Sequence, residues 1–414
     1  MSTLIKGSNL FYGNSTGQQK IIRSTLALLV WSMLFLAIMA FQLAHLSFFL
    51  DHDVVAYYEH TRRHFFFNPH HLLFTIYGRA LTLALPDWPH STMFLFQVVH
   101  ITLATATILY LSRYFRRLSG SLLLGLALGA LLFSLRGFWV YSHIYDTPIV
   151  PTCLGLLTFI SIACGRATGR QVLLASFLMA LTLAFHQKHF LLVLPAVLLF
   201  FQKSKESGLR RFLPGMLFLL LSTALIAMLY FFAGAVHHAY PLSGRTYLPG
   251  VEQGGDFFDW LFLYSHYGNS WGRAFDPVAG LQGLIQAVVY TRQKVFTAGD
   301  PETLIVALYF GLALLALIIA LLSANSTALL AFLWFFLEAT LSFWWEPIYF
   351  EHWVSPAAIL CLAMGLAFCG FERHYRLFVA GQTLFSVPIF GVALLMGLWN
   401  YERAVLRSEE RRVG

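Results

Sequence analysis

The sequence predicts an all-α polytopic integral membrane protein, and three observations support that prediction. Of its 414 residues, 58% are hydrophobic and only 11% are charged, whereas an ordinary soluble domain carries about 25% charged residues. Apolar runs close to the length of a bilayer-spanning helix recur along the chain. Between these runs, basic residues collect in alternate connections, as the positive-inside rule expects.

A bilayer core takes about 20 apolar residues as a helix, and on that measure the chain holds about eleven spans. The first span follows a short polar tail, residues 1–20, and is too long for the apolar part of a cleavable signal. The spans are expected near 26–50, 91–112, 120–139, 147–164, 171–186, 189–202, 212–236, 303–323, 327–345, 355–371 and 377–399. They form a single transmembrane domain, residues 21–400, which a charged tail follows at 401–414.

The basic residues set the orientation, with the N-terminus inside. The connections placed inside carry clusters of Lys and Arg, for example at 113–117, 203–211 and 373–376. The connections placed outside hold most of the acids and histidines. We therefore expect a multi-pass protein of the cell (inner) membrane whose functional face is periplasmic or extracellular. These inner loops account for the net charge of +8, so it does not indicate a nucleic-acid partner.

The first outer loop, residues 51–90, carries the most distinctive pattern. The first span runs directly into LDHDVVAYYEH, so Asp51 and Asp53 lie where the chain leaves the membrane. A carboxylate there can act as a general base, and in an extended segment the two can hold a divalent cation, Mg or Mn. Alternatively, the two acids only mark the start of a solvated loop. Two amphipathic helices are expected to follow along the outer surface, at 54–63 and 68–86.

Further outer segments hold cations and polar residues. Arg292 and Lys294 come shortly before the eighth span, and the segment WWEPIYFEHWVSP carries Glu351 and His352. A cation at membrane level can bind a lipid phosphate of the substrate, or it can simply extend toward lipid headgroups. The outer cations are Arg62, Arg63, Arg79, Lys188, Arg245, Arg273, Arg292 and Lys294.

Histidines also gather on the outer side. They are His70, His71, His186, His189, His237 and His238. We expect them to hydrogen-bond a substrate or a lipid phosphate rather than to form a metal centre, because adjacent histidines seldom point at one ion. Glu338, within FLWFFLEATLSFWW, is an ionisable group at membrane depth and hence a functional candidate. It can pair with a buried histidine or line a cavity, or it can lie near enough to the outer edge to be solvated.

Over roughly residues 24–112 the chain resembles the GT-C glycosyltransferases that use polyprenyl-phosphate sugars. This superfamily includes the protein O-mannosyltransferases and the aminoarabinose transferase acting on lipid A. Its members carry an acidic motif after the first span, often Asp-Glu, with a Tyr four residues after the Asp. Interfacial helices follow, from a His-Pro-Pro-Leu-Tyr-like stretch to a Phe-Gly or Tyr-Gly. Here Tyr57 lies four residues after Asp53, and NPHHLLFTIYG follows.

Two departures and one further match belong to this resemblance. The chain has no Asp-Glu pair, and NPHH stands where His-Pro-Pro is usual. Late in the family's membrane domain, an outer loop carries a basic or His residue, an aromatic and a following Pro. His352, Trp353 and Pro356 match that pattern loosely.

The resemblance implies a GT-C-like bundle that moves a sugar from a polyprenyl-phosphate donor to a lipid, glycan or protein acceptor. Asp53, with Asp51 as second choice, would be the general base, and a divalent cation held by the same pair is the one cofactor considered. Membrane lipids would surround the site. The candidate substrate-binding residues are Tyr57, Tyr58, His70, His71, Arg79, Arg292, Lys294, Glu351 and His352.

Two other functions stay open. A transporter or flippase of a lipid-linked or amphipathic substrate would make use of Glu338. Transporters tend to be built from related halves with polar residues at the midplane, whereas here the polar groups crowd on one outer face and no internal repeat is visible. An acyl- or phosphotransferase of the same topology would use an outer histidine as its base.

Overall fold

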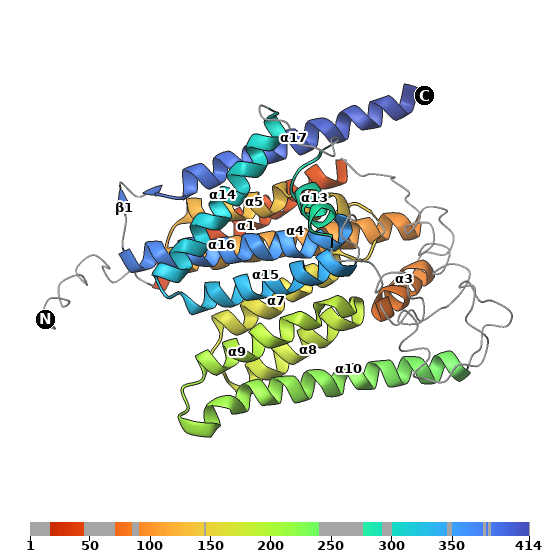
Figure 1. Cartoon of the computed structure of the whole chain (residues 1–414), viewed down its shortest axis with the longest axis vertical. Helices are drawn as coiled ribbons and strands as arrows, with labels where there is room; N and C mark the ends of the chain where they lie inside the picture. Colours follow the sequence, from red (N-terminus) through yellow and green to blue (C-terminus); the bar gives the residue numbers. More distant parts are fainter. Residues whose placement is uncertain are drawn as a thin grey trace, which may run out of the picture. The chain divides into compact units, whose positions relative to one another are not determined.

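The structure, a computed structural model, is built almost entirely of helices (Figure 1). The residues that it describes are 17–44, 71–84, 91–144, 146–239, 276–291, 300–345, 350–375, 378–379 and 382–413. By its internal contacts the chain divides into two units, Met1–His45 and Leu46–Gly414. The described element of the first unit is α1 (Gly17–Ala44), which covers most of the first expected span.

The second unit is a bundle of helices of unequal length. The longer ones are α4 (Ser91–Ser119), α10 (Leu213–Ala239), α14 (Pro301–Leu322), α15 (Ser326–Trp345), α16 (Val354–Tyr375) and α17 (Ser386–Val413). The shorter ones are α3 (Leu72–Ala84), α5 (Leu122–Ser134), α6 (Arg136–Ser142), α7 (Ile149–Cys164), α8 (Gly169–Phe185), α9 (Val193–Lys203) and α13 (Pro277–Val288). Within the described residues, three 3-10 segments link them, η2 (Gln187–Leu192), η3 (Gly208–Phe212) and η4 (Phe350–Trp353).

Five helices of the described chain are long and apolar enough to cross a membrane, or six when the bent pair α5 and α6 counts as one crossing. They are Met93–Ser119, Gly208–Ala233, Pro301–Leu322, Ser326–Trp344 and Phe350–Arg373. The chain is therefore an all-α membrane protein. The expected count of about eleven is larger because it also includes α1, α7, α8, α9 and α17, which are not among these helices. Of these, α7, α8 and α9 are shorter than the roughly 20 residues that cross a bilayer.

The last helix differs from the sequence expectation at both ends. A span was expected over 377–399, but α17 begins at Ser386. The residues before it form a short antiparallel pair, β1 (Phe378–Val379) with β2 (Gln382–Thr383). At its other end α17 continues to Val413, so the expected charged tail is an extension of this helix.

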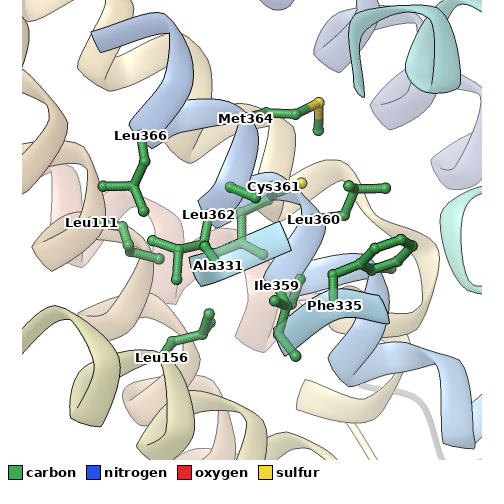
Figure 2. Packing of buried hydrophobic residues seen from close by; sticks show 14 of the residues in the cluster. Leu111, Leu156, Ala331, Phe335, Ile359, Leu360, Cys361, Leu362, Met364 and Leu366 are labelled. Carbon is green, nitrogen blue, oxygen red and sulfur yellow. The ribbon is translucent and has the colours of Figure 1, made fainter. Parts of the chain in front are cut away.

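Helix α16 forms the centre of the bundle. It packs against α4, α5, α7, α14 and α15, and in Figure 1 it lies between α14 and α15. Its apolar side chains meet those of neighbouring helices in a continuous core (Figure 2). Gly365 permits the close approach of α16 to α4, because a Cβ at this position would press on the ring of Phe115.

Helix α3 packs against α4 and α8, and it lies at the end of the bundle opposite the β1 strand (Figure 1). The rings of Phe74 and Phe96 are 5.5 Å apart, and the ring of Tyr77 is 4.5 Å from that of Phe96. A helix within 68–86 is thus confirmed. The helix expected at 54–63 lies outside the described residues.

The outer end is the end of the second unit at which α3, η2 and η4 lie. The inner end is the opposite one, with the turns after α4, α7, α9 and α14 (Figure 1). At the inner end helix termini are closed locally; for example, the hydroxyl of Ser121 accepts a hydrogen bond from the N–H of Leu124 at the start of α5.

Candidate functional site

A small polar pocket lies at the outer end, and four separate parts of the chain form its wall. It has a volume of about 40 Å³, enough for one small polar group. The lining residues are His71, Asp146, Thr147, Pro148, His186, Lys188, Glu351 and His352. They come from the start of α3, the α6–α7 connection, the α8–α9 connection and η4, so the pocket depends on tertiary packing.

Lys188 is the cation of this pocket. Its Nζ donates a hydrogen bond to the carbonyl of His352 at 3.1 Å, and Ser342 Oγ donates to the same carbonyl at 2.9 Å. Its backbone N–H donates to Nδ1 of His186 at 3.3 Å. Burial lowers the pKa of Lys188, whereas the negative charges of Glu338 and Glu351 act in the opposite direction.

The acidic and imidazole groups of the pocket are packed closely. Asp146 is 2% exposed, and its Oδ1 accepts a hydrogen bond from the backbone N–H of Thr147. Glu351 Oε1 lies 3.5 Å from Nε2 of His352. The rings of His71 and His186 meet edge to face with centroids 4.5 Å apart. The pocket therefore offers one ammonium, two carboxylates and three imidazoles to a polar ligand.

Beside the pocket, Glu338 is buried in α15 with 1% of its surface exposed. Its Oε1 accepts hydrogen bonds from Trp334 Nε1 at 2.8 Å and from His189 Nδ1 at 2.9 Å. Its Oε2 accepts one from Ser355 Oγ at 2.6 Å. Among the alternatives for this residue, pairing with a buried histidine is confirmed and solvation at the outer edge is wrong. Glu338 lines neither the polar pocket nor the apolar groove described below.

An apolar groove of about 810 Å³ lies between α8, η2 and α10. Its lining residues are Leu183, Gln187, Phe190, Thr223, Ile226, Ala227, Met228, Tyr230 and Phe231. Phe190, Met228 and Phe231 are more than half exposed, so the groove opens to the outside of the bundle. Gln187 Nε2 donates a hydrogen bond to Tyr230 Oη at 2.9 Å. Gln187 lines the groove and Lys188, the next residue, lines the polar pocket.

The structure brings five of the candidates singled out from the sequence into this pocket: His71, His186, Lys188, Glu351 and His352. Arg79 is half-buried in α3 and does not belong to the pocket wall. Other candidates lie outside the described residues, namely Asp51, Asp53, Tyr57, Tyr58, Arg62, Arg63, His70, Arg245, Arg273, Arg292 and Lys294.

Sequence reasoning did not single out Asp146 and Thr147. The signal was the acid in YDTP, which interrupts two apolar runs on the side assigned to the outside. Reading each acid in a short outer connection as a candidate would have found it.

Metal binding was expected, if at all, at Asp51 and Asp53, which the structure does not describe. In the parts of the chain that it does describe, no group of three or more His, Cys, Asp or Glu side chains is arranged to hold a metal ion.

Comparisons with protein-family models, with curated proteins and with solved structures found no match for this chain.

Proposed function

We propose that this protein is a membrane glycosyltransferase that moves a sugar from a polyprenyl-phosphate donor to a lipid, glycan or protein acceptor. The reaction would occur at the outer end of a bundle of about eleven spans, on the periplasmic or extracellular side. One observation carries the proposal: the apolar groove and the polar pocket adjoin at η2, where Gln187 lines one and Lys188 lines the other.

A lipid-linked sugar needs both kinds of surface. Its isoprenoid chain is stabilised by leaving contact with water, and the exposed apolar side chains of α10 and η2 provide that contact. Its phosphate is an anion at membrane level, which a half-buried ammonium can hold with a charge-assisted hydrogen bond. The groove faces outward from the bundle, so a lipid can enter it from the side.

The proposed chemistry is substitution at the anomeric carbon. The acceptor oxygen forms a bond to that carbon while the bond to the polyprenyl phosphate oxygen breaks, and the electron pair leaves with the phosphate. The acceptor proton passes to the carboxylate of Asp53, with Asp51 as second choice. Lys188 would stabilise the charge that grows on the leaving phosphate. Asp51 and Asp53 are also the candidates for holding a divalent cation there.

The test is Asp53→Asn in purified protein, assayed for sugar transfer from a polyprenyl-phosphate donor in detergent. The amide keeps the shape and cannot take the proton, so transfer should fall about 10²–10⁴-fold while the donor still binds. Asp276→Asn is the matched control, because Asn is as good a helix N-cap as the Asp that caps α13. Unchanged transfer by the Asp53 variant would end the proposal for this base.

A transporter or flippase of a lipid-linked substrate is the second candidate, and the buried Glu338 is the observation that favours it. Its matching test is flux of a lipid-linked sugar in sealed vesicles. Flux that disappears in Glu338→Gln, together with no transfer by the wild type, would select transport over catalysis.

A further inference from the structure

We propose that Glu338 and His189 are a positioning pair, which holds η2 from inside the bundle so that Lys188 presents its ammonium to the phosphate of the donor. The inference deepens the proposed function and rests on it for the identity of the anion. Neither residue lines the polar pocket; both would act through Lys188.

The first argument is how Glu338 is bonded. Its two carboxylate oxygens receive donors from Trp334 in the same helix, from His189 in η2 and from Ser355 in α16. Within the described part of the chain, Glu338 meets three donors and no competing acceptor, which fits an ionised carboxylate. Since each donor sits on a different turn or element, this one side chain fixes η2 and the first turn of α16 to α15.

The second argument is that η2 needs such support. It is a 3-10 segment of six residues between α8 and α9. A 3-10 helix is less stable by itself than an α-helix, because the geometry of its backbone hydrogen bonds is poorer. His189 is 0% exposed, and its ring nitrogen Nδ1 donates a hydrogen bond to the carboxylate of Glu338. Lys188 precedes it, so fixing His189 fixes where the lysine side chain starts.

The third argument is the network on the pocket side. Lys188 Nζ reaches the carbonyl of His352, 164 residues away, and Ser342 of α15 donates to the same carbonyl. Helix α15 therefore holds η2 through Glu338 and holds η4 through Ser342. Lys188 lies between these two contacts, Glu338 with η2 and Ser342 with η4, and they restrict its ammonium to the pocket wall.

The negative charge of Glu338 also supports Lys188, because it favours the protonated form of the lysine that the hydrogen bonds hold in place. The titratable groups around Lys188 are Glu338 of α15, Glu351 and His352 of η4, His186 and His189 beside it, His71 at the start of α3, and Asp146 before α7. Glu338 and Glu351 oppose the lowering of the Lys188 pKa by burial. Removing the charge of Glu338 should therefore release the proton of Lys188 at lower pH.

The first experiment needs no ligand. Wild-type protein, Glu338→Gln and Glu338→Ala are labelled in detergent with acetic anhydride across a pH series, and acetylated Lys188 is quantified by mass spectrometry. Only the uncharged amine reacts, so in both variants the curve for Lys188 should move to lower pH. Lys203, at the inner end, is the internal control and should not move. A Lys188 curve that coincides with that of the wild type in both variants overturns the inference.

The second experiment measures affinity for farnesyl phosphate, with farnesol as the probe that lacks the anion. Glu338→Ala should weaken farnesyl phosphate binding about tenfold, a change of roughly 1.4 kcal/mol, and leave farnesol binding unchanged. Glu338→Gln keeps the shape and most of the hydrogen bonds, so its loss should be smaller. Tyr309→Phe is the matched control, since it removes a buried hydrogen bond between α14 and α16 that does not involve η2.

The outcomes separate the two proposals. If the wild type does not bind farnesyl phosphate, the proposed function fails, and the labelling curve still tests the pair. If the wild type binds it and Lys188→Met does not, but both Glu338 variants bind as the wild type does, the positioning role is wrong. Because Glu338→Gln is nearly isosteric, a folding defect of Glu338→Ala leaves the test intact.

Discussion

The two ends of the second unit use their polar side chains in opposite ways. At the inner end these side chains close helix termini: Ser121 caps α5 and Thr168 caps α8, each by accepting a backbone N–H three residues on. Asn325 caps α15 and also donates to the carbonyl of Leu366 in α16. At the outer end the polar side chains instead face one another around a pocket.

The cap bonds of the inner end and the pocket bonds of the outer end differ in how far they reach along the chain, although Asn325 of the inner end also reaches Leu366, 41 residues away. Cap bonds at the inner end join residues three apart, and they stabilise a helix terminus whatever the rest of the bundle does. At the outer end His189 reaches Glu338 across 149 residues, and Lys188 reaches His352 across 164. The cap bonds stabilise single helix termini, whereas the bonds at the outer end join η2 to α15 and to η4.

The largest difference in sugar transfer should appear when one lysine at each end is replaced by methionine in separate variants. Lys188→Met removes the proposed phosphate contact and should reduce sugar transfer about 10²-fold or more, because such contacts act on charge that grows in the transition state. Lys203→Met, at the inner end, should leave transfer unchanged. Steady-state rates in detergent measure both. Equal rates for the two variants would remove the functional contrast between the ends.

The next effect concerns stability. Glu338→Ala leaves His189, Trp334 and Ser355 without their acceptor in a buried site and should lower the free energy of unfolding by about 3–5 kcal/mol. Glu206→Ala, in an exposed inner turn, should change it by less than about 0.5 kcal/mol. Denaturant unfolding in detergent gives both values. A change below about 1 kcal/mol for Glu338→Ala would mean that its network adds little to the bundle.

A pH series should sharpen the contrast further. The ammonium of Lys188 is lost as pH rises through its pKa, and because burial lowers that pKa, farnesyl phosphate binding should weaken below the pH at which an ordinary lysine titrates. Lys188→Arg keeps its charge throughout and should show a flat profile. Isothermal titration at several pH values measures this. Parallel profiles for the two proteins would exclude Lys188 as the group responsible.

The smallest effect belongs to the inner end. Ser121→Ala removes the cap of α5 and should lower stability by about 1 kcal/mol, with sugar transfer unchanged. Thermal unfolding and the transfer assay, run on the same preparation, check both parts. A loss of transfer without a loss of stability would show that the inner end also takes part in the reaction.

Much of the architecture could be predicted from the sequence because apolar length and basic loops are local signals. The positions of α4, α10, α14, α15 and α16 follow from them closely. The number of crossings does not, because hydropathy alone does not separate a short buried helix such as α7 from a full span.

The candidate site was predictable only in part. His352 and Glu351 could be found because they lie in an outer segment rich in aromatic residues. A histidine partner for Glu338 could be anticipated from the cost of burying a lone carboxylate. That the partner is His189 depends on how α15 docks against η2, and no local pattern encodes a contact across 149 residues. Asp146 is a single acid in the short connection between two apolar runs, and such an isolated residue is a weak signal of a functional site.

The wall of the polar pocket runs in sequence from His71 to His352, and this has a consequence for biosynthesis. Because a chain is made from its N-terminus, η4 leaves the ribosome long after the first outer loop, and α15 must then dock before η2 is held in place. A chain stopped before Ser326 lacks both Glu338 and His352. The proposed anion-binding capacity should therefore arise only at a late stage of membrane insertion, and nascent chains should be inert toward lipid phosphates.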